Sequence, residues 1–209
     1  HIKKEINVIP TGIDIEKFKL TPKIKKEMEH IKKEWNLKND DFIIGAVGRI
    51  ATEKSFDILI KNTKKLIEKN KKIKLMIVGD GPEIENLKKL SKDLKVNKNI
   101  IFTGKVKYEL MPAYYNLFHV LVSFSTTETQ GLTIIEGLAA KKPVLCINDK
   151  SFQKMIKNGY NGYLFKDGNE YIKQITELKE NHSLYKKISE NALLSVQEYS
   201  KENFGKKVL

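Results

Sequence analysis

Cysteine and histidine are scarce in this chain of 209 residues, which contains one Cys and four His. A single thiol cannot build a disulfide framework, and no histidine stands at ligand spacing from a cysteine or a carboxylate. No apolar run approaches the roughly 18 residues that a membrane-spanning helix needs. Walker and G-x-G-x-x-G sequences are missing as well. These absences argue against a disulfide-rich scaffold, a metal cluster, an integral membrane protein and the common phosphate-loop sites.

Two residues that often act in catalysis lie in apolar runs. Cys146 belongs to the run PVLCI, and His119 begins the run HVLVS. A free cysteine in such a run usually behaves as a small buried hydrophobe, and a catalytic thiol would need a histidine and a polar approach nearby. We therefore expect both to be strand residues and not catalysts.

Acidic residues are outnumbered, and the formal net charge is +13. The lysines are spread over nearly every expected helix, as in KNTKKLIEKNKKIK, which is typical of solvated helix faces. Nucleic-acid binding would need a basic face with interleaved aromatics or a known module. Docking on an anionic membrane stays open, because each well-placed lysine contributes about 1 kcal/mol. Arg49 is the only arginine, which hints at a site that uses a planar guanidinium.

Short apolar runs alternate with amphipathic segments along the chain. We expect strands at 42–48, 73–79, 99–104, 119–125, 143–148 and 162–165. We expect helices at about 55–69, 82–95, 108–117, 131–140, 151–157, 168–179 and 182–200, with Pro82 in a first helical turn. Strands that are apolar on both faces and alternate with helices predict an α/β fold with a doubly wound, parallel, Rossmann-like sheet.

The first forty residues read differently from the rest. The segment INVIPTGID reads as a short strand ending in a turn, and TPKIKKEMEHIKKEW as an amphipathic helix with Thr21 as its cap and Pro22 in its first turn. Residue 1 is His, so we expect a soluble, cytoplasmic piece of a longer protein. We interpret 1–20 as a linker from a missing domain, 21–209 as one domain, and the helix 182–200 as returning toward that missing domain.

Two groups of polar residues follow expected strands, where ligands bind in doubly wound sheets. Gly48 ends one strand, and Arg49 and Lys54 follow it; paired with a glycine, these cations suit a phosphate or diphosphate. The alternative is that both are ordinary surface cations. The turn in IVGDGPE, after the next strand, reads as a glycine turn before a helix.

The second group is TETQGLTIIE, a polar loop followed by a helix start near Gly131. Free amides and the helix dipole make such a start an anion site, and a glycine lets a ligand approach the backbone. Glu128 lies on the loop and Glu136 in the helix, and both could accept bonds from sugar hydroxyls. A Glu at this helix position is usually exposed, but the apolar neighbours of Glu136 indicate burial, and a buried carboxylate needs partners.

Taken in order, these segments resemble the C-terminal domain of family-four (group 1) glycosyltransferases with the GT-B fold. The resemblance covers nearly the whole chain, and its motifs are IPTGID, GRI followed by EK, IVGDGP, IFTGKV, Glu128 and Glu136 spaced as E-x7-E, PV, and NGYLF. The spelling TETQGLT is similar to bacterial glycosyltransferases that add glucose to diacylglycerol. The family pattern differs at Lys141 and Lys142, where small residues are common, and at Ser55, where Gly is common.

The resemblance implies a role for each matched residue. Arg49 and Lys54 would hold the donor diphosphate beside Gly48, Glu128 would contact the donor hexose, and Glu136 would bind the ribose hydroxyls. Arg49, Lys54 and Glu128 would then form the catalytic set. The remaining substrate contacts would come from Lys105, Val106, Leu110, Thr129, Gln130, Gly131, Leu132 and Thr133, with the base held by main-chain groups near Lys105 and Val106.

The resemblance further implies a retaining hexosyltransferase that needs no metal and no cofactor, with UDP-glucose as the expected donor. Its partners would be a nucleotide sugar, a lipid or glycan acceptor, its own missing N-terminal domain and an anionic membrane surface on the cytoplasmic side, without nucleic acid. This chain alone would be inactive. The alternatives are a polysaccharide or cell-envelope glycan acceptor, a GT-B-like epimerase or phosphorylase, and a non-catalytic basic module that binds nucleic acid or membrane.

Overall fold

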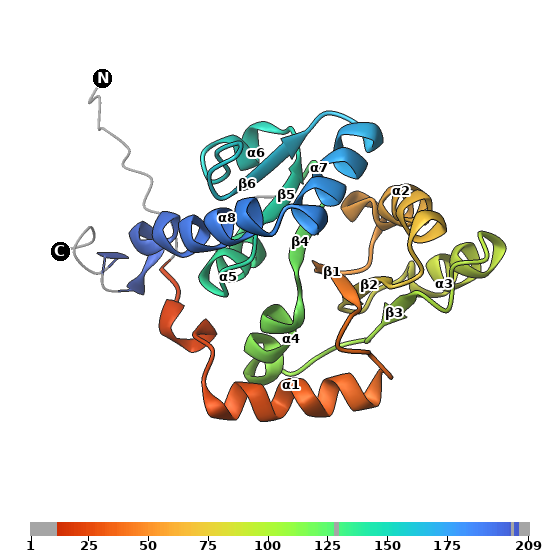
Figure 1. The fold of residues 1–209 in the computed structure, drawn as a ribbon, viewed down its shortest axis with the longest axis horizontal. Coiled ribbons are helices and arrows are strands. Elements are labelled where there is room, and N and C mark those ends of the chain that lie inside the picture. The colour runs from red at the N-terminus through yellow and green to blue at the C-terminus, as the bar shows by residue number, and fades with distance from the viewer. Residues whose placement is uncertain (1–11, 128–129, 202, 205–209) are drawn as a thin grey trace, which may run out of the picture.

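The computed structural model describes residues 12–127, 130–201 and 203–204. Their centre is a six-stranded sheet in the order β3-β2-β1-β4-β5-β6, in which every strand pair is parallel. The strands are β1 (Phe42–Val47), β2 (Ile73–Val78), β3 (Ile100–Phe102), β4 (Val120–Ser123), β5 (Val144–Ile147) and β6 (Gly162–Phe165). The predicted doubly wound α/β fold is therefore confirmed (Figure 1).

Helices cover both faces of the sheet (Figure 1). They are α1 (Pro22–Glu34), α2 (Phe56–Lys69), α3 (Ile84–Asp93), α4 (Met111–Leu117), α5 (Leu132–Ala139), α6 (Lys150–Gln153), α7 (Gly168–Glu180) and α8 (His182–Ser195). Single turns of 3-10 helix occur at η1 (Ile15–Phe18), η2 (Thr52–Lys54), η3 (Tyr108–Leu110) and η4 (Gln197–Tyr199). Among the described residues, no helix combines the length and apolar character that crossing a membrane requires.

Successive residues of each strand pack into two separate hydrophobic cores, one on each face of the sheet. Ile43 and Cys146 face the core built with α1, α4 and α5, whereas Ile44 and Leu145 face the core built with α2, α3 and α7. This alternation follows from the pleat of a β-strand, which sends successive side chains to opposite faces. Because both faces are buried, the strands are apolar throughout, as the sequence indicated.

The predicted buried strand thiol is confirmed, because Cys146 lies within β5 with no exposed surface. His119 directly precedes β4, and its Nδ1 accepts a hydrogen bond from the Ile43 amide at 3.0 Å. It is thus tied into the sheet. The α1 prediction is also confirmed, since the Thr21 side chain accepts from the Ile24 amide as an N-cap.

Several predicted element ends were wrong by a few residues. The helix expected from 82 begins at Ile84, because Pro82 lies in a turn that the Glu83 amide pins to the Ile50 carbonyl at 3.1 Å. The helix expected over 108–117 starts with the 3-10 turn η3. The helix expected over 182–200 ends at Ser195, and η4 follows it.

The largest error concerns the helix expected over 151–157, which is only the short α6 ending at Gln153. The side chain of Asn161 explains the early end. Its amide nitrogen donates to the Met155 carbonyl at 2.8 Å, and its oxygen accepts from the Lys157 amide at 2.8 Å. These bonds satisfy backbone groups that a continuing helix would have used internally.

The segment before α1 packs against the domain from residue 13 onward. Ile13 forms a parallel bridge with Ser200, and Phe18 of η1 is 1% exposed. The strand expected in INVIPTGID lies mostly outside the described residues. The interpretation of 1–20 as a linker, and of the last helix as returning toward another domain, stays a prediction.

Candidate functional site

Loops from three parallel strands meet at the carboxyl edge of the sheet. The Gly48 amide, after β1, donates to the Val78 carbonyl at 3.0 Å, and the Gly79 amide, after β2, donates to the Gly104 carbonyl, after β3, at 3.1 Å. Gly79 has a φ of +140°, and a Cβ on it would lie 1.9 Å from the Gly48 oxygen. Only glycine permits this approach of the first two loops.

The first predicted group lies at this edge. A Cβ on Gly48 would meet no atom within 4 Å, so open space adjoins its backbone. Arg49 is exposed, and Lys54 is half-buried at the end of η2. Ser55 follows with a left-handed φ of 53° and begins α2. The loop thus presents both cations next to an accessible stretch of backbone.

The second predicted group adjoins the first, because β4 pairs directly with β1. Lys54 and Thr133, the second residue of α5, line one small pocket together with Ser123 at the end of β4. The Ser125 hydroxyl lies 3.5 Å from the Glu53 carbonyl oxygen, so the two loops touch. The tertiary structure therefore brings a cation and a helix start to one place.

The helix start differs slightly from the expectation, since α5 begins at Leu132 and Gly131 is its N-cap. Gly131 has a φ of +63° and is buried, whereas Leu132 and Thr133 are half-buried and Gln130 is exposed. The first-turn amides of a helix lack intrahelical partners, so they can face an anion. Glu128 and Thr129 lie outside the described residues.

Glu136 is buried in the second turn of α5, with 8% of its surface exposed. It has the partners that a buried carboxylate needs: the Tyr115 hydroxyl donates to Oε2 at 2.7 Å, and the Tyr108 hydroxyl donates to Oε1 at 3.2 Å. Burial raises the pKa of Glu136, while the two tyrosine bonds act in the opposite direction. The alternative of an exposed surface carboxylate was wrong.

The loop after β3 leads toward this carboxylate. Lys105 is exposed, and Val106 is half-buried against the core that contains α4 and α5. Tyr108 and Leu110 both belong to η3, and the Leu110 side chain is 37% exposed. The structure thus joins the segment expected to contact a base to Glu136 through Tyr108.

Tyr108 and Tyr115 were not selected from the sequence. The signal that could have found them is the acidic residue within the apolar stretch TIIEGLAA, which demands buried donors, together with the tyrosines of the segment KVKYELMPAYYNL. Which tyrosine would face the carboxylate depends on how α4 and α5 pack. Spacing alone does not give that orientation.

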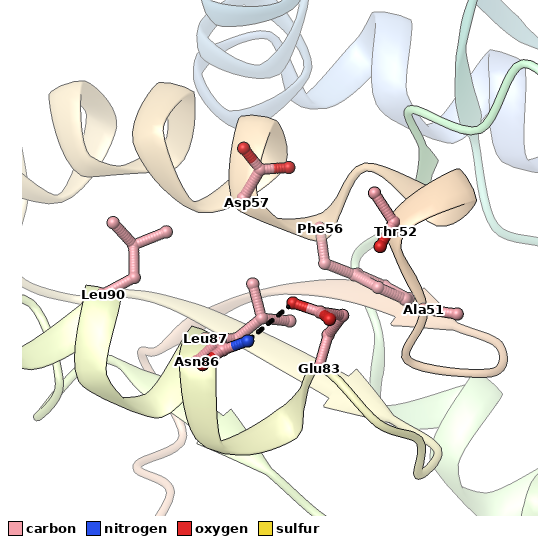
Figure 2. A pocket seen from close by; sticks show the side chains of 8 residues that line it. All are labelled: Ala51, Thr52, Phe56, Asp57, Glu83, Asn86, Leu87 and Leu90. Carbon is pink, nitrogen blue, oxygen red and sulfur yellow. Dashed lines mark hydrogen bonds between the residues drawn. The ribbon is translucent and has the colours of Figure 1, made fainter.

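A separate cavity of about 320 Å³ opens between the start of α2 and α3. Its lining consists of Ala51, Thr52, Phe56, Asp57, Glu83, Asn86, Leu87 and Leu90. Figure 2 shows the Asn86 amide donating to the Glu83 carboxylate, at 2.9 Å. Two carboxylates disfavour an anion, and none of the predicted site residues lines this cavity, so it is distinct from the phosphate-type site.

Among the residues that the structure describes, no group of three or more His, Cys, Asp or Glu could hold a metal ion. Arg49 and Lys54 bring positive charge to the site. The chemistry that these residues offer is binding of an anion beside a buried acceptor of hydroxyl hydrogen bonds.

The model of the family described as glycosyl transferases group 1 matches residues 27–194. The chain belongs to this family. The family resemblance expected from the ordered motifs is therefore confirmed. Homologues of this domain are named glycosyltransferases.

Among curated relatives of this group 1 domain, alpha-monoglucosyldiacylglycerol synthase of Acholeplasma laidlawii is 33% identical over 202 residues, which is 97% of this chain and 51% of the relative. The chain thus spans about half the length of the curated relatives it matches. A structure of HepE from Anabaena with UDP and glucose superposes with a TM-score of 0.84 at 21% identity, over 97% of this chain and 55% of that one.

A crystallised C-terminal domain of the group 1 glycosyltransferase LpcC from Francisella tularensis is similar over its whole length. It matches 91% of this chain and 100% of that domain, with a TM-score of 0.78 and 23% identity. At such identities the two structures establish the fold alone.

Proposed function

We propose that this chain is the donor-binding domain of a retaining glycosyltransferase that transfers a hexose from a nucleotide diphosphate sugar, with UDP-glucose as the donor. The observation that carries the proposal is the proximity of Lys54 to Thr133, which line one pocket of about 10 Å³ at the edge where Gly48 leaves open space. A cation, a helix start and accessible backbone together suit a diphosphate.

Sugar transfer needs stabilisation of the charge that develops on the leaving nucleotide diphosphate. Arg49 would bind it as a planar fork and Lys54 as a point charge, while the first-turn amides of α5 would donate hydrogen bonds to it. Folded elements hold these hydrogen-bonding groups in place before the nucleotide sugar binds. The protein therefore needs little reorganisation during the reaction.

The nucleoside would lie over the neighbouring strand ends. Glu136 would accept from the ribose hydroxyls, and main-chain groups at Lys105 and Val106 would hold the base. Leu110, on η3, would pack beside it. As the resemblance implies, the hexose would contact Glu128 and the loop residues Thr129 and Gln130. Gly131 and Leu132 would lie beneath the hexose.

For the acceptor we propose diacylglycerol or a glycolipid. The support is the name of the Acholeplasma laidlawii relative, a monoglucosyldiacylglycerol synthase, and the loop sequence TETQGLT. Such an acceptor would require a second, N-terminal domain and contact of the whole enzyme with the cytoplasmic face of an anionic membrane, which the net charge of +13 would favour.

Isothermal calorimetry of the chain with UDP tests the proposal. We expect binding, and we expect Arg49→Ala to weaken it by about tenfold or more, because a hydrogen-bonded ion pair contributes roughly 1.5–3 kcal/mol. The matched control is Lys98→Ala, which removes an equal charge just before β3. Lys98 lies at the amino ends of the strands, whereas the site lies at their carboxyl ends. Absence of UDP binding to the unaltered chain, or equal effects of the two substitutions, would contradict the donor site.

A further inference from the structure

Two tyrosines from different elements converge on one carboxylate. Tyr115 comes from α4 and bonds Oε2 of Glu136, while Tyr108 comes from η3 and bonds Oε1. Glu136 itself is on α5, so three elements supply this cluster. A cluster that joins three elements around a single buried acid holds that acid in one orientation.

The two tyrosines differ in exposure. Tyr115 has no exposed surface, and its ring packs edge-on against Phe18 and Phe118 at centroid distances of 5.6 and 5.8 Å. Tyr108 is 52% exposed, and Lys17 Nζ of η1 lies 5.8 Å from its ring centroid. Tyr115 is therefore a fixed donor, whereas Tyr108 is a donor at the solvent-facing rim.

A carboxylate offers about four acceptor positions on its two oxygens. The tyrosines occupy one position on each oxygen of Glu136. In the described part of the chain each oxygen accepts one such bond, so a carboxylate with about four positions can also accept from both hydroxyls of a vicinal diol. Donated hydrogen bonds also favour the charged form of an acid, which is the stronger acceptor.

We propose that Tyr108 and Tyr115 are positioning residues that hold Glu136 as a bidentate acceptor for the cis-diol of the donor ribose, with Tyr108 controlling the outer oxygen. This inference rests on the proposed donor site. It adds that recognition of the ribose depends on a half-exposed phenol that does not itself need to contact the nucleotide.

The test compares UDP with 2′,3′-dideoxy-UDP, which lacks the diol, on the chain and on its Tyr108→Phe variant. Phe keeps the ring and its contact with Lys17. Because residue 108 is exposed, the variant should fold like the unaltered chain. We expect the Kd for UDP to rise about 5- to 15-fold, as loss of one bond to a charged group implies. The Kd for the dideoxy compound should stay unchanged.

Tyr115→Phe should likewise weaken binding of UDP and leave binding of the dideoxy compound unchanged. Its thermal unfolding is measured in parallel, because this side chain is buried and its change could destabilise the fold. The control is Tyr160→Phe, an exposed tyrosine outside the site. If Tyr108→Phe weakens both ligands equally, leaves UDP binding unchanged or strengthens it, the inference is overturned. Equal binding of UDP and dideoxy-UDP by the unaltered chain also overturns it. A chain that binds neither ligand instead contradicts the proposed function itself.

Discussion

The main-chain amide of Ile43 in β1 donates a hydrogen bond to Nδ1 of His119, 3.0 Å away at the start of β4. His119 also stacks on Phe42, with ring centroids 4.8 Å apart, and its carbonyl accepts from the Tyr185 hydroxyl. Burial, together with the positive charges of Lys142 and Lys32, lowers the pKa of His119 to about 4. The imidazole therefore serves as a neutral acceptor that joins two strands.

We predict that this histidine makes the fold sensitive to acid. The unfolded chain binds a proton at His119 near pH 6.5 and the folded chain only near pH 4. The contribution of the neutral imidazole to the free energy of unfolding is therefore complete above pH 6.5 and is lost as the pH falls toward 4. The loss is on the order of 2 to 3 kcal/mol. Urea unfolding between pH 7 and pH 4 measures it.

The matched variant is His119→Asn, whose side-chain oxygen can accept from the Ile43 amide but cannot titrate. It should remain stable at pH 7 and lose much less stability toward pH 4 than the unaltered chain. A variant with an acid dependence as steep as that of the original would show that other groups, and not His119, dominate.

The close approach of the β1 and β2 loops predicts that Gly79 tolerates no side chain. In Gly79→Ala the new Cβ would lie 1.9 Å from the Gly48 oxygen, a backbone atom that cannot move without breaking the loop pairing. We expect a loss of about 2 kcal/mol or more in the free energy of unfolding, and weaker binding of UDP because Gly48 is displaced.

Gly159 supplies the control, because it also has a positive φ, +72°, but open space where a Cβ would be. Gly159→Ala should lower the free energy of unfolding only by the strain of the left-handed conformation, about 1 kcal/mol. It should leave UDP binding intact. Equal effects of the two substitutions would show that backbone conformation, and not the contact with Gly48, makes Gly79 necessary.

Removal of divalent metal should leave nucleotide binding unchanged. The proposed donor site uses Arg49, Lys54 and the amides of α5 for the diphosphate, and the described residues contain no cluster that could hold a metal ion. UDP titrations in EDTA and in magnesium chloride should give the same Kd. Loss of affinity in EDTA that magnesium restores would contradict this reading of the site.

Much of the fold was predictable because it depends on local pattern. The run around Ile44 is apolar at every position, which requires a strand covered on both faces, and Thr21 with Pro22 marked the start of α1. The end of α6 was not predictable, because Asn161 bonds residues that precede it by four and six positions and thereby replaces helix with a turn. Such side-chain competition leaves no periodic signal.

By itself, the amino-acid sequence determined the parallel α/β fold, the family, and the placement of Gly48, Arg49 and Lys54 after a strand end, because each follows from apolar runs and local motifs. Tertiary structure alone decided that Lys54 and Thr133 share a pocket and that Tyr108 and Tyr115 bond Glu136. Those contacts join residues up to 79 positions apart, between Lys54 and Thr133 (133 − 54). They depend on how helices rotate and pack over the sheet, which local propensity does not specify.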